Sequence, residues 1–168
     1  MTPFRFEHEF RADSAAQFWR GYFDEQHIAH LDAELGLRAR ELKERREDEH
    51  TLYRVVRVVP ERELPGWLRK LTGAGLDYEE RLTFHKDENR CELLILPSLF
   101  SSRTRIEGTY DVQELGPGRL LRRFFGEIDI RVPVIGGRVE RSVLADMESS
   151  YRRAMVMTQA WLDADSAL

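Results

Sequence analysis

The stretch VPVIGGRVERSVLADM, residues 132–147, joins an apolar segment to a segment of helical periodicity. Pro133 marks the end of the apolar segment, because proline donates no hydrogen bond to a strand ladder. Gly136 and Gly137 come next, and the apolar residues after them recur at helical spacing. We therefore expect the last strand to run up to a sharp corner that the two glycines form, and a helix to begin there.

The helix after this corner is the longest that the sequence predicts. Its apolar stripe consists of Val139, Val143, Met147, Tyr151, Met155, Thr158 and Leu162, with Ala154 and Trp161 beside it. Its outer face carries Arg141, Glu148, Arg152 and Arg153. About 24 residues in this pattern make a helix roughly 36 Å long. Such a helix must bury its stripe, and a curved antiparallel sheet is the partner that we expect.

Alternation of apolar and polar residues predicts strands over most of the remaining chain. The predicted strands cover residues 4–11, 37–47, 51–60, 76–86, 90–99, 104–114 and 120–134. The segment 37–47 is polar enough to be an exposed or edge strand, and GPGR at 116–119 predicts a turn. Short connections between the strands indicate antiparallel pairing.

Two short helices are expected directly after the first strand. Asp13 or Ser14 caps a helix that carries Phe18, Trp19 and Tyr22. The second helix covers residues 25–35 and stops at Gly36. A further segment, ELPGWLRKLTGAG at 63–75, has the spacing of a short amphipathic helix or an apolar loop.

The order of one strand, two helices, six strands and a long C-terminal helix resembles the helix-grip fold of the START-like superfamily, also called SRPBCC. That superfamily includes lipid-transfer domains, pollen-allergen proteins and aromatase/cyclases. The stretches that carry the resemblance to an uncharacterised bacterial branch are LPGWLRKLTG (64–73), DYEERLTF (77–84), EGTYDV (107–112) and VPVIGGRVERSV (132–143), with WL at 161–162 ending the helix.

This resemblance covers essentially the whole chain and implies a single α+β domain over residues 1–168. The implied architecture is a curved antiparallel sheet of six or seven strands wrapped around the C-terminal helix. Such proteins typically enclose an apolar cavity between sheet and helix, which implies a pocket for a lipid or another hydrophobic molecule. Non-covalent binding of a lipid, isoprenoid, quinone or polyketide is therefore the expected function, in preference to catalysis.

Large inward side chains and a few polar groups are the candidate ligand-binding residues. They are Trp67, Tyr78, Glu80, Phe84, Ile95, Ile106, Tyr110, Arg122, Phe124, Ile128, Met147, Tyr151 and Met155. Methionine adapts to ligands of variable shape, although the same residue types also fill ordinary cores. A protein with a filled core would be an interaction module, and the outward Leu94 and Leu96 are then its expected dimer contacts.

Four polar residues fall on the apolar faces of their strands: His8, Glu80, Tyr110 and Arg122. Because a buried charge needs a partner, Glu80 and Arg122 could form an internal ion pair or hold the polar head of a ligand. The same groups could perform acid–base chemistry in an enzyme of the cyclase or hydratase kind. The simpler interpretation, which we favour, is that they lie near strand ends and reach water.

Several classes of function are disfavoured by composition. With 26 basic and 30 acidic residues the net charge is −4, so no basic surface for nucleic acid is expected. His27 and His30 lack a third ligand at metal-binding spacing and are expected on a solvated helix face, so we expect no metal. No nucleotide fingerprint is present, and no cofactor is expected. Cys91, the only cysteine, is expected to be a small buried hydrophobe.

The expected location is the cytoplasm. The segment MTPFRFEHEF alternates phenylalanine with charge and lacks the apolar core of a signal peptide. No apolar run approaches the roughly 20 residues of a membrane-spanning helix. We expect a monomer or a weak homodimer, with Trp67 and Leu71 at a mouth that contacts the ligand or, transiently, a membrane.

Overall fold

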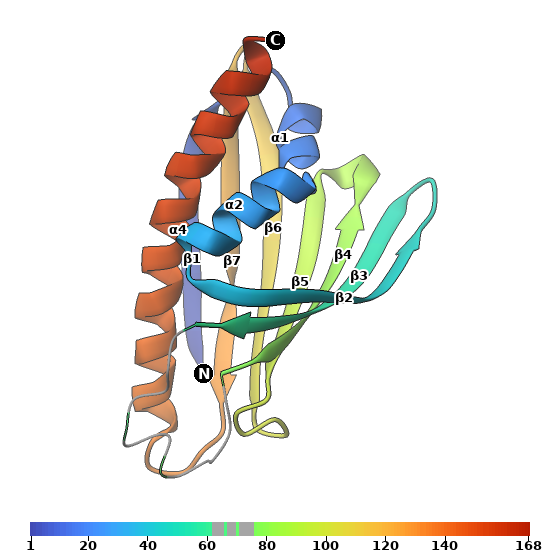
Figure 1. The fold of residues 1–168 in the computed structure, drawn as a ribbon. Helices are drawn as coiled ribbons and strands as arrows, with labels where there is room; N and C mark the ends of the chain where they lie inside the picture. The colour runs from blue at the N-terminus through green and yellow to red at the C-terminus, as the bar shows by residue number, and fades with distance from the viewer. Residues whose placement is uncertain (62–65, 67–69, 71–75) are drawn as a thin grey trace.

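The computed structural model describes residues 1–61, 66, 70 and 76–168. Seven antiparallel strands form one sheet in the order β1-β7-β6-β5-β4-β3-β2 (Figure 1). The strands are β1 Thr2–Arg11, β2 Leu37–Glu47, β3 Thr51–Pro60, β4 Tyr78–His85, β5 Arg90–Pro97, β6 Thr104–Gly116 and β7 Arg119–Ile130. The helices are α1 Ala15–Tyr22, α2 Glu25–Glu34, the 3₁₀ turn η1 Lys86–Glu88 and α4 Gly136–Ser166. The predicted α+β helix-grip architecture is therefore confirmed.

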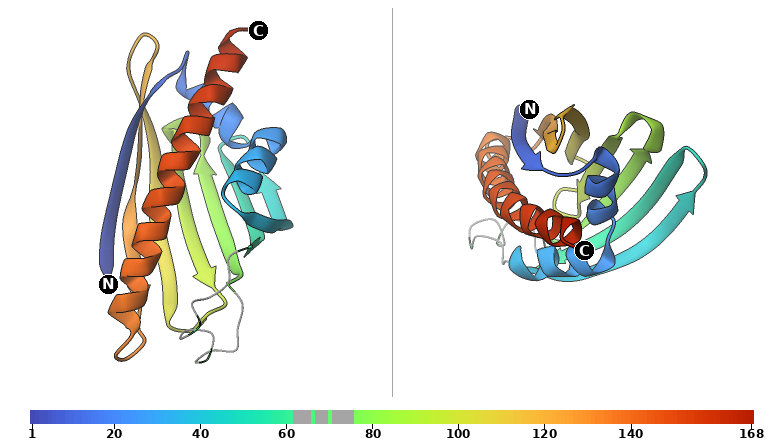
Figure 2. Two further views of the ribbon diagram at one scale, coloured as in Figure 1. Left: turned by 60° about the vertical axis from the view of Figure 1, so that its left-hand side comes forward. Right: turned by 90° about the horizontal axis from the view of Figure 1, so that it is seen from above.

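The long helix α4 packs on the sheet, which curves around it (Figure 2). Its apolar stripe faces the sheet as predicted, but the stripe is less buried in the middle of the helix than near either end. Val139, Met155 and Leu162 are buried, whereas Val143, Met147 and Tyr151 between them are only half-buried. The C-terminal half is covered further by α1 and α2, which contact it. The middle of α4, residues 143–151, is thus its less tightly enclosed part.

The predicted boundaries of the short helices are confirmed by their capping groups. The Ser14 side chain accepts a hydrogen bond from the Gln17 backbone N–H at 3.1 Å and so begins α1. After α2, Gly36 adopts a left-handed φ of 69°, which glycine reaches without steric cost. The segment 63–75, including Trp67 and Leu71, lies almost entirely outside the described residues.

Strand β2 is the edge strand that its polarity predicted. Most of its side chains are exposed, and neighbouring positions carry opposite charges that pair along the strand. Lys43 contacts Glu41 at 2.7 Å and Arg46 contacts Glu44 at 2.8 Å. The β2 edge of the sheet therefore presents a row of mixed charges, and β1 forms the other edge.

The corner before α4 differs from the prediction. Strand β7 ends at Ile130, and residues 131–135 form a separate turn in which the Gly136 N–H donates to the Val132 carbonyl at 2.8 Å. The left-handed residue in this turn is the fully exposed Val134, with a φ of 70°, and neither Gly136 nor Gly137 has a positive φ. The glycines therefore do not supply the bend, and the expectation that the strand runs to residue 134 was wrong.

Gly136 is nonetheless required at its position, for a different reason. A Cβ atom there would lie 2.4 Å from the carbonyl oxygen of Ile130, which is far inside contact distance. A Cβ on Gly137 would meet only the end of the Arg141 side chain, at 3.7 Å. Gly136 lets α4 start directly against the end of β7, whereas a side chain at Gly137 would cause no steric clash.

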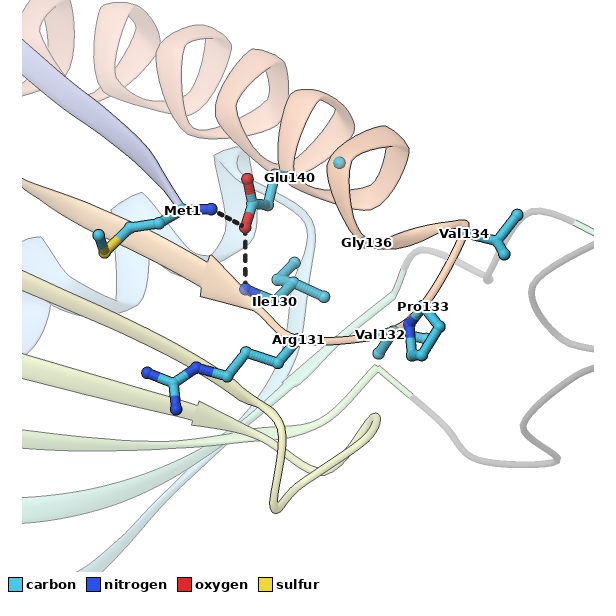
Figure 3. A pocket seen from close by; sticks show the side chains of 9 residues that line it. Met1, Ile130, Arg131, Val132, Pro133, Val134, Gly136 and Glu140 are labelled. Carbon is cyan, nitrogen blue, oxygen red and sulfur yellow. Dashed lines mark hydrogen bonds and ion pairs between the residues drawn. The ribbon is translucent and has the colours of Figure 1, made fainter.

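A buried carboxylate fastens this corner (Figure 3). Glu140, 4% exposed, accepts a hydrogen bond from the backbone N–H of Ile130 at 2.9 Å and one from the Thr2 hydroxyl at 2.5 Å. The amino group of Met1 forms an ion pair with it at 2.9 Å. One side chain of α4 thus holds the end of β7 and the start of β1.

The two neighbouring glycines provide a matched test of the corner. We expect Gly136→Ala to lower the free energy of unfolding by about 1–3 kcal/mol, because the new methyl group must displace backbone. Gly137→Ala should be neutral or should stabilise by up to about 1 kcal/mol, because alanine reduces the freedom of the unfolded chain. Urea denaturation of both variants measures the difference. Equal effects of the two substitutions would contradict the close approach at Gly136.

A second prediction concerns acid stability. Burial raises the pKa of Glu140, but the hydrogen bonds from Thr2 and Ile130 and the charge of Met1 outweigh it and hold that pKa below its usual value. A lowered folded-state pKa means that the carboxylate stabilises the fold above its unfolded pKa, and that this contribution is lost as the pH falls through the folded-state value. The stability difference between wild type and Glu140→Gln should therefore be largest near pH 7 and shrink below about pH 4.5.

The control for this prediction is Glu148→Gln on the exposed face of α4. Glu148 pairs with Arg152 at 2.5 Å, but both side chains are largely in water. Its substitution should change the free energy of unfolding by less than about 0.5 kcal/mol. Thermal or urea unfolding between pH 3 and pH 7 measures the free energy of unfolding of both variants. An effect of Glu140→Gln on this free energy that does not depend on pH would contradict the prediction.

Candidate functional site

A cluster of aromatic rings lies between β1, β7, β6 and α4. Tyr110 and Phe124 are cross-strand neighbours, and their rings stack with centroids 3.8 Å apart. Phe124 also contacts Phe4 at 4.8 Å, and Phe6 stacks on Tyr151 of α4 at 5.1 Å. Side chains at paired positions share one face of a sheet, so the strand register itself assembles this cluster.

A groove of about 370 Å³ opens at the side of this cluster, between β1 and α4. Its apolar and aromatic lining consists of Phe6, His8, Tyr151, Met155 and Val156. Its charged lining consists of Arg5, Glu7, Glu148 and Arg152. These charges neutralise one another, since Arg5 pairs with Glu7 at 2.5 Å and Arg152 with Glu148 at 2.5 Å. The groove therefore offers an apolar wall with an electrically balanced rim.

A second hollow, of about 380 Å³, lies at the corner before α4 (Figure 3). It is lined by the turn residues 131–134 together with Met1, Ile130, Gly136, Gly137 and Glu140. Its one carboxylate already accepts hydrogen bonds from Ile130 and Thr2 and pairs with Met1. We assign this hollow to the structure of the corner, and nothing in the sequence patterns pointed to the role of Glu140.

Arg122 is the most unusual residue beside the β1–α4 groove. It lies on β7 between Val112 of β6 and His8 of β1, and only 6% of it is exposed. The expectation that it reaches water at a strand end was wrong, because α4 covers this part of the sheet. Its guanidinium carbon lies 4.3 Å from the ring centre of Tyr110 and 5.2 Å from that of Tyr151.

Glu80 does not form the ion pair with Arg122 that we considered. The two residues lie on β4 and β7, which are three strands apart in the sheet, or about 14 Å. Glu80 instead lies 3.8 Å from Arg40 and 3.7 Å from Arg54, and Arg40 is held by two hydrogen bonds to Asp32 of α2. The alternation of residues along each strand correctly placed both side chains on the inward face of the sheet. Their partners depend on the order of the strands, which the alternation does not give.

The polar residues considered for catalysis are thus separated into two groups. His8, Tyr110 and Arg122 lie together beside the groove, whereas Glu80 belongs to the charged network near β2. Burial lowers the pKa of His8, and the charge of Arg122 lowers it further, so the imidazole is neutral at pH 7. Burial raises the pKa of Tyr110, which keeps its hydroxyl protonated.

The other candidate ligand-binding residues lie on the face of the sheet or helix that points between them. Phe84, Ile106, Arg122, Phe124, Ile128 and Met155 are buried, and Tyr78, Glu80, Ile95, Tyr110, Met147 and Tyr151 are half-buried. Trp67 lies outside the described residues. Phe6 and Val156 line the groove but were not among the candidates, although the alternation of residues 4–11 puts Phe6 on the same face as His8.

His27 corrects another expectation. Its side chain is not on a solvated face but buried, with its Nε2 atom 3.4 Å from the Thr158 hydroxyl and its ring beside Trp161 of α4. Only His30 is exposed as expected. Within residues 1–61 and 76–168, no cluster of three or more His, Cys, Asp or Glu side chains suits a metal ion. Cys91 is fully buried, as predicted.

None of the helices in the described part of the chain is long and apolar enough to cross a membrane.

Known structures share this arrangement of strands and helices and so identify the fold. A START superfamily protein from Mycobacterium smegmatis is similar over 96% of this chain and 97% of its own, with 14% identity and a TM-score of 0.62. Norcoclaurine synthase from Thalictrum flavum, in complex with dopamine and hydroxybenzaldehyde, is similar over 96% and 87%, with 15% identity and a TM-score of 0.64. The Zhui aromatase/cyclase from Streptomyces sp. R1128 is similar over 99% and 94%, with 14% identity and a TM-score of 0.58.

The fold is therefore that of the START-like superfamily, as the sequence stretches implied. Residues 5–162 match the model of DUF2505, described as a protein of unknown function, and the chain belongs to that family. No curated protein matches the sequence. The structural similarity to these proteins establishes the fold. Because the sequence identities are only 14–15%, the activities of those proteins are not assigned to this chain.

The charged network around Glu80 yields a prediction about stability. Glu80→Gln removes the negative charge between Arg40 and Arg54, and we expect it to lower the free energy of unfolding by about 1–3 kcal/mol. Glu79→Gln, on the opposite and more exposed face of β4, is the matched control and should cost less than about 0.5 kcal/mol. Urea denaturation compares them, and a Glu80 effect no larger than that of Glu79 would show that the network contributes nothing.

Proposed function

We propose that this protein binds a hydrophobic small molecule non-covalently between the sheet and α4. The observation that carries the proposal is the β1–α4 groove, whose apolar wall of Phe6, Tyr151 and Met155 continues into the aromatic cluster around Phe124. Its volume of about 370 Å³ falls within the range of small-molecule sites, about 300–1,000 Å³.

The burial pattern of α4 supports the same location. Val143, Met147 and Tyr151 are large apolar or aromatic side chains that face the sheet and yet stay half-buried. Burying the remaining apolar surface against a ligand would contribute roughly 25 cal/mol per Å². Similarity in fold to a protein solved with dopamine and hydroxybenzaldehyde, both small and aromatic, supports a ligand of comparable size.

The ligand-binding residues that we propose are those predicted residues that lie around the groove and the aromatic cluster. They are Tyr110, Arg122, Phe124, Met147, Tyr151 and Met155. The neutral rim of the groove disfavours attraction of strongly charged polymers, and a small molecule fits it better.

Binding of a neutral fluorescent probe tests this function. N-phenyl-1-naphthylamine should bind the wild-type protein with a stoichiometry near one and a blue-shifted emission. Val156→Glu places a charge on the apolar wall at a position that is 72% exposed, so the fold should tolerate it. We expect this variant to weaken probe binding at least about fivefold, because a carboxylate beside an apolar ligand loses hydration.

The matched control is Ala160→Glu, one turn further along α4 at an exposed position outside the groove lining. It should bind the probe as the wild type does. Native mass spectrometry of the freshly purified protein, followed by solvent extraction, should reveal any molecule already bound. Absence of probe binding together with an unoccupied protein mass would overturn the proposed function.

A further inference from the structure

The buried guanidinium of Arg122 lacks a counter-charge among the residues that the structure describes. Within residues 1–61, 66, 70 and 76–168, no carboxylate oxygen lies within 4.0 Å of it. Its neighbours are the rings of Tyr110, Tyr151 and Phe18, at 4.3, 5.2 and 5.6 Å, and the Met155 sulfur, 3.5 Å from Nη1. A buried arginine is normally paired, because removing its charge from water is costly. Aromatic faces and a weak sulfur acceptor compensate only part of that cost.

Two hydrogen-bond donors at this place have no acceptor in the described part of the chain. The Nε atom of Arg122 and the hydroxyl of Tyr151 are both buried and unpaired among the described residues. Leaving a buried polar group without a partner costs about 1–3 kcal/mol. These two orphan donors belong to side chains already in contact, since the Arg122 guanidinium lies over the Tyr151 ring. A single acceptor located between them could satisfy both.

The β1–α4 groove gives such an acceptor a route to the guanidinium. Three residues that line the groove border Arg122: its cross-strand neighbour His8, and Tyr151 and Met155 of α4. Met155 both lines the groove and contacts Nη1, and its unbranched side chain is flexible and changes rotamer easily. The neutral imidazole of His8 and the protonated hydroxyl of Tyr151 add no negative charge to compete with an anion.

We propose that the ligand of this protein is a carboxylic acid with an apolar chain or ring, whose carboxylate pairs with Arg122 and accepts a hydrogen bond from Tyr151. This inference rests on the proposed function and specifies the head group of the ligand. A carboxylate matches the planar fork of a guanidinium and can accept two parallel N–H bonds. The apolar part of the molecule then lies along Phe6, Met155 and Val156 in the groove.

The experiment compares an acid with an uncharged molecule of the same length. Isothermal titration calorimetry at pH 7.4 measures the binding of dodecanoate and of 1-dodecanol to wild-type protein, each below its aggregation concentration. A purely apolar site would favour the alcohol, because a carboxylate is harder to remove from water. We expect dodecanoate to bind at least about tenfold more tightly, since a charge-assisted pair with Arg122 more than offsets that cost.

Three variants assign the preference to the proposed groups. Arg122→Met keeps a long apolar side chain and should abolish the preference for dodecanoate over 1-dodecanol. Tyr151→Phe removes only the unpaired hydroxyl and should weaken dodecanoate about threefold or more. Arg123→Met, on the opposite face of β7 where Arg123 pairs with Asp111, is the control and should change neither affinity.

The outcomes separate this inference from the proposed function. If the neutral probe and 1-dodecanol bind but dodecanoate binds no better, or if Arg122→Met retains the preference, the protein binds apolar ligands and the carboxylate site is overturned. The aromatic cage then suffices to hold the Arg122 charge. If neither dodecanoate, 1-dodecanol nor the neutral probe binds, the proposed function fails as well. The wild-type comparison needs no variant and therefore stands even if Arg122→Met fails to fold.

Discussion

The hydrogen bond between the Glu140 carboxylate and the Ile130 backbone N–H is the contact on which the arrangement of sheet and helix depends. It fixes the N-terminal end of α4 against the end of β7, and the bond from Thr2 brings the start of β1 to the same point. Because Gly136 allows the helix backbone to touch the Ile130 carbonyl, the helix cannot be shifted along the strand without losing both contacts. The position of every α4 side chain over the sheet, including Tyr151, follows from this anchor.

Local patterns in the sequence predicted the elements and their inward faces well. The alternation in residues 4–11, the stripe of α4, the Ser14 cap and the Gly36 stop are all present in the structure. These features depend on residues close together in the chain, so their signal is contained within a few turns or one strand. The turn at 131–135 was not predictable in this way, because the left-handed residue is Val134, a residue type that rarely adopts such a φ.

Contacts between distant elements were the part that the sequence did not reveal. The partners of Glu80 depend on strand order, and the burial of His27 depends on how α2 lies against α4. Nothing in the sequence indicated that Glu140 is buried at the corner, because glutamate is also common in the first turns of helices at the protein surface. The alternation of the strand did place Arg122 on the inward face, but only the packing of α4 over β7 shows that its charge is enclosed, with no carboxylate of the described residues beside it.

The mixed charges along β2 have a consequence for how this sheet meets other chains. An edge strand exposes unpaired backbone N–H and C=O groups that could template the addition of a foreign strand. On β2, an approaching strand would have to strip water from pairs such as Lys43–Glu41 and Arg46–Glu44 before any backbone bond formed. An open, curved sheet can therefore keep one long edge in solvent without inviting amyloid-like growth, and the molecule needs no further element to cover it.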